Sequence, residues 1–521
     1  MSPDILFLQI SKLYPLQEIK KRMQTQETTG ERVSTGVEGV DSILHGGFIP
    51  ERTYMVRGDP GTGKSLLGLH FLLNGAENGE EVLYINPEES AANIRQNAAS
   101  FGFDVEDLEF LDLSPDSEFF SKDLSYDIFS PDEVEQESLT AEIADRVETL
   151  TPDRVFVDPL TQLRYLAPDD YQFRKQVLSF MDFLHGEGAT VLFTSQDTTP
   201  QPDDDLQFMS DGTITLTRHL RERLLEVTKF RGSNFEDGRH SFRIRHGGLH
   251  VFPDLIPRQH GREFANETIP SGVPELDQLL YGGLERGTAT IITGPTGVGK
   301  TTTGVQFMKE AAGRGERSVV YTFEEGRETL IHRCESINMP IREMLDRGTL
   351  RIEEIEPLEL SADEFAYRVR REIEDHDTEI VMLDGIVGYR LSVHGDRDDL
   401  TREIHKLGKY MKNMGATLLL INETNSIAAD FEVTDDGVSY LADNILFLRH
   451  LEIGGEMRKA IGVLKKRTSD FERSVREFEL DEYGIRIGEP MTDLRGILNG
   501  TPEWVDEPNE LLRDGGSESE S

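Results

Sequence analysis

The sequence predicts an α/β fold made of two tandem domains of similar design, and three observations support this. A glycine-rich loop occurs twice, and each copy stands between an apolar strand and a helix. Other motifs recur in both halves at one spacing: Lys64 and Lys300, like Asp41 and Asp277, lie 236 positions apart. Each half then continues with further short apolar strands, the pattern of a largely parallel sheet. The 521 residues suffice for two such domains with full cores.

The domain limits follow from the repeat. The segment Thr35–Asp41 matches Ser271–Asp277, and the pair Gly46-Gly47 matches Gly282-Gly283 at the same spacing. We expect an N-terminal extension over 1–30, a first domain over 31–252, a linker over 253–265, a second domain over 266–494, and an acidic, disordered tail over 495–521. The first 22 residues are more basic than the rest and lack a signal-peptide cleavage site. Met23 as the true start is a hypothesis that an intact mass would test.

Both glycine-rich loops fit the pattern G-x-x-x-x-G-K-[ST], which predicts a nucleoside triphosphate site. The first copy is Gly58, Asp59, Pro60, Gly61, Thr62, Gly63, Lys64 and Ser65, and the second is Gly294, Pro295, Thr296, Gly297, Val298, Gly299, Lys300 and Thr301. Glycines let successive backbone N–H groups turn toward the phosphates, the lysine reaches the β and γ oxygens, and the hydroxyl holds Mg²⁺. The strands Thr53–Arg57 and Ala289–Thr293 are expected to enter the loops, and the segment Leu66–Leu73 begins the first helix.

Two neighbouring acids follow the next strand in each half. They are Glu88 and Glu89 after the strand at 82–87, and Glu324 and Glu325 after the strand at 319–323. Ligands of a parallel sheet meet the carboxyl ends of its strands, so these carboxylates are candidates to position or deprotonate the water or hydroxyl that attacks the γ-phosphate. An acidic first turn of the following helix is the alternative.

A third strand in each half ends in an aspartate, Asp158 or Asp384, and a carboxylate there suits a second group that orients Mg²⁺. A strand cap would look the same. The two aspartates are 226 positions apart, so the first half carries ten extra residues, which we assign to the acidic loop from Ser114 to Glu137.

A basic pair closes each half after a further apolar strand, at 190–196 or 417–423, whose polar end could sense the γ-phosphate. The pairs are Lys229 with Arg231 and Lys465 with Arg467, again 236 positions apart. On a strand, positions i and i+2 face the same side, so both cations would point at one target. A phosphate is the target we expect, and ion pairing with surface carboxylates is the alternative.

The composition restricts partners and surroundings. Asp and Glu number 97 against 55 Lys and Arg, which gives a net charge of −42 and a sequence pI near 4.7. Because salt screens such repulsion, we expect the cytoplasmic protein of a halophile, and an acidic protein kept soluble by its charge is the alternative. Nucleic-acid binding is disfavoured, since it requires clustered basic residues. The single cysteine, Cys334, is expected in the core of a protein from a reducing compartment, and no apolar run is long enough to cross a membrane.

With these motifs in order, residues 31 to 500 resemble the KaiC family of tandem RecA-like ATPases, in particular its archaeal KaiC-like branch. The resemblance implies two RecA-like P-loop NTPase domains, ATP with Mg²⁺, and a homo-hexamer with ATP between neighbouring subunits. Lys229, Arg231, Lys465 and Arg467 would then reach the γ-phosphate of the adjacent subunit, where such arginines are worth roughly 10³ to 10⁵ in rate.

The family's second ring also phosphorylates itself, and the resemblance places Ser439 at the acceptor serine, with Glu324 as general base. Tyr440 stands where the family has a threonine, and Gln207 and Phe208 occupy the hydroxyl positions of the first copy. Phosphotransfer is therefore expected in the second domain alone.

The sequence as a whole predicts an ATP-hydrolysing, KaiC-like signalling or clock-type protein, with serine/threonine autokinase activity as a further hypothesis. One rival is a DNA recombinase or helicase motor on the same fold, which would need basic loops that follow DNA. The other is a non-catalytic scaffold gated by nucleotide, which only measured turnover separates from an ATPase. Signalling proteins are expected as partners, and their identity is open.

Overall fold

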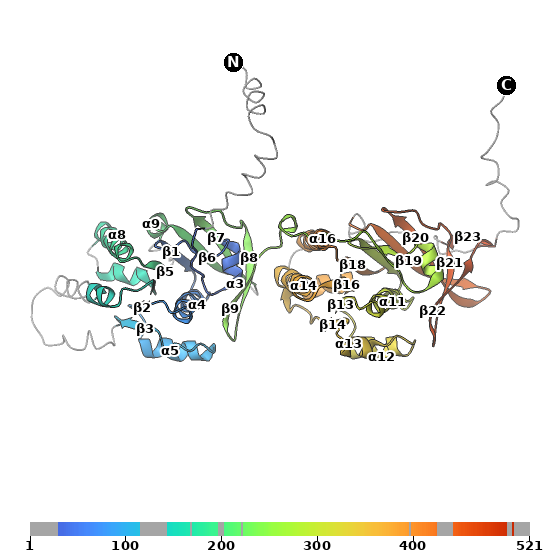
Figure 1. Ribbon diagram of the computed structural model, residues 1–521, viewed down its shortest axis with the longest axis horizontal. Coiled ribbons are helices and arrows are strands. Elements are labelled where there is room, and N and C mark those ends of the chain that lie inside the picture. Colours follow the sequence, from blue (N-terminus) through green and yellow to red (C-terminus); the bar gives the residue numbers. More distant parts are fainter. Residues whose placement is uncertain are drawn as a thin grey trace, which may run out of the picture. The chain divides into compact units, whose positions relative to one another are not determined.

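Each half of the chain builds its own α/β unit around one large sheet. The computed structural model describes residues 30–114, 143–166, 169–195, 203–219, 222–394, 397–424, 441–497 and 503–504. The chain divides into two compact units, Met1–Pro253 and Asp254–Ser521. Figure 1 shows the same layering in each unit, a twisted sheet with helices packed on it.

The sheet of the first unit has nine strands within the described residues, in the order β3-β2-β4-β5-β1-β6-β7-β8-β9. The strands are β1 Thr53–Gly58, β2 Val82–Asn86, β3 Glu109–Asp112, β4 Arg154–Val157, β5 Thr190–Ser195, β6 Gly212–His219, β7 Glu222–Phe230, β8 Arg239–Arg245 and β9 Gly248–Phe252. The helices are α3 Glu38–Ile43, α4 Lys64–Glu77, α5 Ala91–Ser100, η1 Leu160–Leu166, α8 Asp170–Gly186 and α9 Asp204–Met209. In the order of the sheet, the six strands β3, β2, β4, β5, β1 and β6 are parallel, and the strands from β6 to β9 form antiparallel hairpins.

The second unit repeats this topology in the order β14-β13-β16-β18-β12-β19-β20-β21-β22, again counted within the described residues. Its main strands are β12 Ala289–Gly294, β13 Arg317–Thr322, β14 Leu350–Glu354, β16 Thr378–Asp384, β18 Thr417–Glu423, β19 Asn444–Ile453, β20 Glu456–Lys466, β21 Arg476–Asp481 and β22 Gly484–Pro490. Its helices are α10 Pro274–Leu279, α11 Lys300–Gly313, α12 Arg327–Glu335, α13 Ile341–Asp346, α14 Ala362–His376, α15 Ile386–Ser392, α16 Arg397–Met414 and the short η2 Pro257–Gln259. Two-stranded pairings join β10 Thr268–Ile269 with β11 Leu284–Glu285, β15 Leu360–Ser361 with β17 Val393–His394, and β23 Leu494–Arg495 with β24 Glu503–Trp504.

The central strands are buried on both faces because helices cover each sheet on two sides. In β1, Tyr54 and Val56 belong to the core under α4, while Met55 belongs to the core on the opposite face. In β12, Ile292 and Ile291 divide between two cores in the same way. The α/β class and the tandem arrangement predicted from the sequence are therefore confirmed. Cys334 is fully buried, and burial raises the pKa of its thiol to about 11.

The repeated opening motif has the same local structure in both units. Thr35 donates through its backbone N–H and its hydroxyl to Asp41 Oδ1, each at 2.7 Å. Ser271 makes the same two bonds to Asp277 Oδ1, both at 2.7 Å. The aspartate thus fixes the chain as it enters α3 or α10, which explains why these residue types recur.

The segment predicted as a linker, 253–265, has contacts of its own from Asp254 onward. Leu255 is buried in a core of the second unit, and Lys406 Nζ of α16 lies 2.8 Å from Asp254 Oδ1. Arg262 donates through Nε to the Met414 carbonyl at 2.5 Å. Residues 254–262 therefore lie on the second unit.

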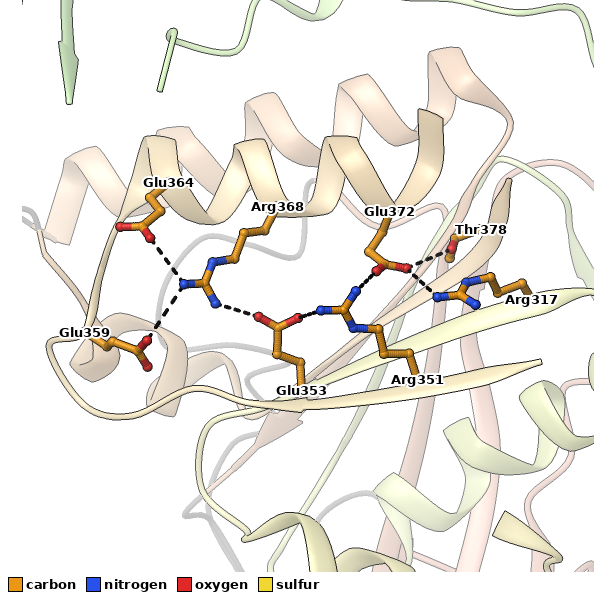
Figure 2. Close-up of polar contacts among 8 residues, drawn as sticks. All are labelled: Arg317, Arg351, Glu353, Glu359, Glu364, Arg368, Glu372 and Thr378. Atoms are coloured by element: carbon orange, nitrogen blue, oxygen red, sulfur yellow. Dashed lines mark hydrogen bonds and ion pairs between the residues drawn. The ribbon is translucent and has the colours of Figure 1, made fainter. Parts of the chain in front are cut away.

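A chain of ion pairs crosses one edge of the second sheet, and Figure 2 shows it running between α14 and strands β13 and β14. Arg351 binds Glu372 and also Glu353, the latter at 2.9 Å. Arg317 lies 3.2 Å from Glu372, and Arg368 links Glu353 with Glu364. Since Glu364 and Glu372 are buried, this network fixes α14 on the edge of the sheet.

Candidate nucleotide sites

The two phosphate loops connect the central strand of each sheet to the helix that follows. Gly58, at the end of β1, has φ +147°, and a Cβ there would lie 2.2 Å from the Leu216 carbonyl oxygen. Gly294, at the end of β12, has φ +154°, and a Cβ there would lie 2.3 Å from the Leu448 carbonyl oxygen. Only glycine fits positions that combine this backbone with such close approach. The loops therefore have the strand, turn and helix context that the motif requires.

Each loop lysine lies folded over its own loop. Lys64 Nζ donates to the carbonyl oxygens of Gly58 at 2.7 Å and Asp59 at 3.1 Å, and Lys300 Nζ donates to the Pro295 carbonyl at 2.9 Å. Burial lowers the pKa of both ammonium groups, against the opposing effect of nearby carboxylates. Both lysines thus lie at the mouth of the loop.

The predicted Mg²⁺ positions differ between the units. In the second unit, the Thr301 hydroxyl donates to Asp384 Oδ1 at 2.8 Å, so the two expected ligands already touch. Burial raises the pKa of Asp384 to about 6. In the first unit, Asp158 accepts a bond from the Tyr84 hydroxyl at 3.0 Å and another from Thr194. Ser65 lies on the first turn of α4 and borders the same cavity as Asp158.

The paired glutamates also lie beside the loops. Glu324 accepts a bond from the Gly388 N–H at 3.2 Å, and Glu88 lines the first cavity. Asn97 donates to Glu89 Oε1 at 2.9 Å, while Arg333 holds Glu325 through two bonds, from Nε at 3.1 Å and from Nη2 at 2.6 Å. Burial, followed by the charges of Asp158 and Glu88, raises the pKa of Glu89.

A cavity opens over each loop and brings most predicted residues together. The first has a volume of about 860 Å³ and includes Lys64, Ser65, Glu88, Glu89 and Asp158. The second has a volume of about 330 Å³ and includes Lys300, Thr301, Glu324, Glu325 and Asp384. Apolar side chains also line them, Phe101 and Ile244 in the first and Ile337 and Leu480 in the second. Such a combination suits a ligand that joins an apolar ring to charged groups.

Sequence reasoning missed several residues of these sites. Arg223 donates to the Gly61 carbonyl at 2.8 Å, and Lys459, 236 positions later, donates to the Gly297 carbonyl at 3.2 Å. Burial lowers the pKa of both side chains. Asn97 and Arg333, which hold the second glutamate of each pair, form another such set. A search for polar residues at the 236-residue spacing would have found all four.

The basic pairs do not border the cavity of their own unit. Lys229 Nζ donates to the carbonyl oxygens of Gln207 at 2.6 Å and Ser210 at 2.5 Å, at the end of α9. Arg231 lies 3.7 Å from Asp211, and Arg467 lies 3.7 Å from Asp443. The strands β7 and β20 end at Phe230 and Lys466, so each arginine lies one residue beyond its strand, where its N–H still bonds the aspartate carbonyl.

Several expectations fall outside the described residues. These are Ser439 and Tyr440, the basic N-terminal extension and Met23, most of the acidic loop from Ser114 to Glu137, Gln196, and the acidic end of the tail. Gln207 and Phe208 are described and lie on α9. Within the part of the chain that is described, no helix has both the length and the apolar character needed to span a membrane.

Comparison with known proteins agrees with this architecture. The family model described as the KaiC ATPase matches the chain twice, over residues 33–256 and 269–492. The chain belongs to the KaiC family of ATPases. The resemblance to the KaiC family inferred from the motifs is thereby confirmed, and the two tandem domains are consistent with a RecA-like fold.

Curated relatives of this family match over almost their whole length. The circadian clock oscillator protein KaiC of Acaryochloris marina is 28% identical over 499 residues, which is 92% of this chain and 94% of the relative. The protein of the same name from Synechococcus elongatus is 29% identical over 499 residues, 92% of this chain and 94% of its own. The circadian clock protein KaiC3 of Synechocystis is 28% identical over 502 residues, 93% of this chain and 97% of its own.

Proposed function

We propose that this KaiC-family protein hydrolyses ATP at both phosphate loops, with Mg²⁺ bound beside the γ-phosphate. The observation that carries the proposal is the second cavity, where Lys300, Thr301, Asp384 and Glu324 border one space. They supply the cation, hydroxyl and carboxylates that phosphoryl transfer to water requires. The equivalent set in the first unit supports the same activity there.

The residues present fit ATP and Mg²⁺. The positive φ of Gly61 and Gly297 and the open space around their Cα atoms leave room for phosphates to approach the backbone. Hydroxyl and carboxylate oxygens are the ligands that Mg²⁺ prefers, and Thr301 and Asp384 offer one of each at 2.8 Å. In the first unit, Ser65 and Asp158 would hold the ion. When bound, Mg²⁺ neutralises the charge that develops on the phosphate oxygens.

The reaction assigns one role to each protein group. A water oxygen attacks the γ-phosphorus, the bond between that phosphorus and the β,γ-bridging oxygen breaks, and ADP and phosphate form. A glutamate, Glu324 in the second unit and Glu88 or Glu89 in the first, orients the water and accepts its proton. Lys300 and Lys64 stabilise the negative charge of the phosphoryl oxygens.

Assembly into a homo-hexamer completes these sites in the proposal. The cavity of each unit is not lined by the basic pair of that unit, Lys229 with Arg231 or Lys465 with Arg467. The side chains of the two arginines are about half exposed, at 54% and 51%. An arginine in this situation can serve the γ-phosphate of a neighbouring subunit. ATP then lies at subunit interfaces, and turnover depends on assembly.

A serine/threonine autokinase activity of the second unit is a second candidate. It is favoured by Glu324, which accepts the Gly388 N–H and lines the ATP cavity as a general base would. Ser439 is the proposed acceptor. The names of the relatives connect them with circadian clocks, and we extend to this chain only a signalling role with protein partners to be identified.

Incubation of the purified assembly with Mg·ATP in high salt tests both activities, because the net charge of −42 favours the cytoplasm of a halophile. Phosphate release and phosphopeptide mass spectrometry are measured on the wild type, Lys300→Ala and Glu324→Gln. Phosphate on Ser439 that disappears in both variants establishes the autokinase. Phosphate release without phosphoprotein leaves an ATPase, and the autokinase proposal is then withdrawn.

The same assay separates the rival functions. A nucleotide-gated scaffold binds ATP but releases no phosphate above the level of a Lys64→Ala/Lys300→Ala double variant. A recombinase or helicase motor is stimulated by single-stranded DNA, whereas we expect no stimulation from a surface this acidic.

A further inference from the structure

Position 97 of the first unit and its counterpart, position 333 of the second, carry different residues against otherwise matched glutamates. Asn97 lies on α5 and Arg333 on α12. Each contacts the second acid of its pair, Glu89 or Glu325. The backbone of that acid is held alike in the two units, since Asn86 donates to the Glu89 carbonyl at 2.8 Å and Thr322 donates to the Glu325 carbonyl at 2.6 Å. The difference is therefore confined to the side chain.

Arg333 binds both carboxylate oxygens of Glu325. Its Nε and Nη2 bond the two carboxylate oxygens at 3.1 and 2.6 Å, and its Nη1 donates to the Thr302 hydroxyl at 3.1 Å. Thr302 is buried on the first turn of α11, directly after Thr301. The guanidinium is thus anchored to the helix that follows the phosphate loop. A bidentate arginine pair is geometrically specific and stronger than a bond from an amide.

The first unit lacks both parts of this clamp. Asn97 gives Glu89 a single amide bond at 2.9 Å, and Leu66 replaces the threonine at the position equivalent to Thr302. Two differences thus distinguish the sites, an Arg–Thr pair in the second and an Asn–Leu pair in the first.

We infer that Arg333 is a positioning residue that ties Glu325 away from the attacking water, so that Glu324 alone accepts the proton in the second site. This inference rests on the proposed ATP hydrolysis and deepens it. A carboxylate whose two oxygens are each held by a guanidinium N–H cannot turn toward a water, and one lone pair of each oxygen is already occupied. In the first site, Glu89 retains an oxygen for this role.

A double-mutant cycle tests the inference in assembled protein whose first site is silenced by Lys64→Ala. The cost of Glu325→Gln to kcat is measured in protein that also carries Glu324→Gln, with Arg333 present and in Arg333→Asn. We expect that cost to be at least tenfold larger in the Arg333→Asn background, because only there can Glu325 reach the water. Equal costs in the two backgrounds overturn the inference, and Arg333→Lys, which cannot bridge both oxygens, is expected between the two.

The reciprocal cycle uses the first site, with Lys300→Ala silencing the second. Introducing the clamp as Asn97→Arg with Leu66→Thr is expected to reduce the cost of Glu89→Gln at least tenfold. If the Lys64→Ala protein binds ATP but shows no hydrolysis above the double-lysine variant, the proposed function fails for the second site. If it hydrolyses ATP and the costs do not depend on residue 333, the positioning role fails alone.

Discussion

The two nucleotide sites share a backbone but differ in the side chains that surround it. The three loop glycines have φ values of +147°, +75° and +109° in the first unit and +154°, +74° and +116° in the second. Around these loops, Asp158 is bonded by Tyr84 and Thr194, whereas Asp384 is bonded by Thr301. The phosphate cradle is thus set by glycines in a backbone conformation that other residues rarely adopt, while the carboxylates take their environment from whichever residues lie nearby. Two copies of one motif can therefore run at different rates.

The largest effect is expected from the arginines proposed to act between subunits. Arg231→Ala and Arg467→Ala each remove a cation from the γ-phosphate of the neighbouring subunit. Each variant should therefore lower kcat by roughly 10³ or more, Arg231→Ala at the sites of the first unit and Arg467→Ala at those of the second. Phosphate release is measured in proteins whose other site is silenced by a loop-lysine variant. If the two losses of kcat differ, the larger loss shows which unit depends more on the arginine of the neighbouring subunit.

Mixing distinguishes action between subunits from action within one. Assemblies formed from Arg231→Ala and Lys64→Ala subunits should regain part of the ATPase activity of the first site. The Arg231→Ala subunits supply an intact phosphate loop, and the Lys64→Ala subunits supply an intact arginine. No recovery in mixed assemblies would place the arginine in the site of its own chain.

A second comparison concerns the ion pairs at the edge of each sheet. The carboxylate of Glu372 is buried in the network of Figure 2, where Arg317 and Arg351 hold it. In the first unit, Arg146 pairs with Glu109 of the edge strand β3, and each of these two side chains is about 40% exposed. Glu372→Ala is expected to lower the free energy of unfolding of the second unit by about 2 kcal/mol, since Arg317 and Arg351 lose the buried carboxylate that they share, while Arg351 keeps Glu353.

Urea unfolding monitored separately for each unit, for example by hydrogen exchange, measures this difference. Arg146→Ala is the matched control, and an exposed pair should cost less than about 1 kcal/mol. Equal losses from Glu372→Ala and Arg146→Ala would mean that the network contributes no more than an ordinary surface pair.

The smallest effect is expected at the first Mg²⁺ position. Tyr84→Phe removes the 3.0 Å bond to Asp158 and should raise the Mg²⁺ concentration for half-maximal first-site hydrolysis about tenfold, which corresponds to about 1.4 kcal/mol. The second site has Val320 at the equivalent position and should not respond. Tyr54→Phe, whose hydroxyl bonds the backbone of Ile49, is the control for loss of a buried hydroxyl. A response of both sites would indicate a change in the fold instead.

Much of the site could be predicted because strand ends and a loop motif are local features. The carboxyl ends of parallel strands meet at one edge of the sheet, so Lys300, Glu324 and Asp384 were predicted together and do border one cavity. The spacing could have marked position 333, but the contacts of Arg333 with Glu325 and Thr302 could not be predicted, because they depend on α12 packing against the first turn of α11. The sequence also did not show that Arg231 and Arg467 lie one residue beyond their strands. The aspartate whose carbonyl binds each arginine N–H is about 20 residues earlier in the chain.

By itself, the sequence determined the α/β class, the duplication, the phosphate loops and the order of their catalytic candidates. These follow from glycine conformation and apolar strands, which act over a few neighbouring residues, and from a constant spacing of 236 residues that can be read directly from the chain. The tertiary structure decided which groups hold each carboxylate, how the segment from Asp254 to Arg262 packs, and where Glu372 finds its partners. Those outcomes depend on side chains that meet only when distant elements pack together, because hydrogen bonds and ion pairs form over a few ångströms.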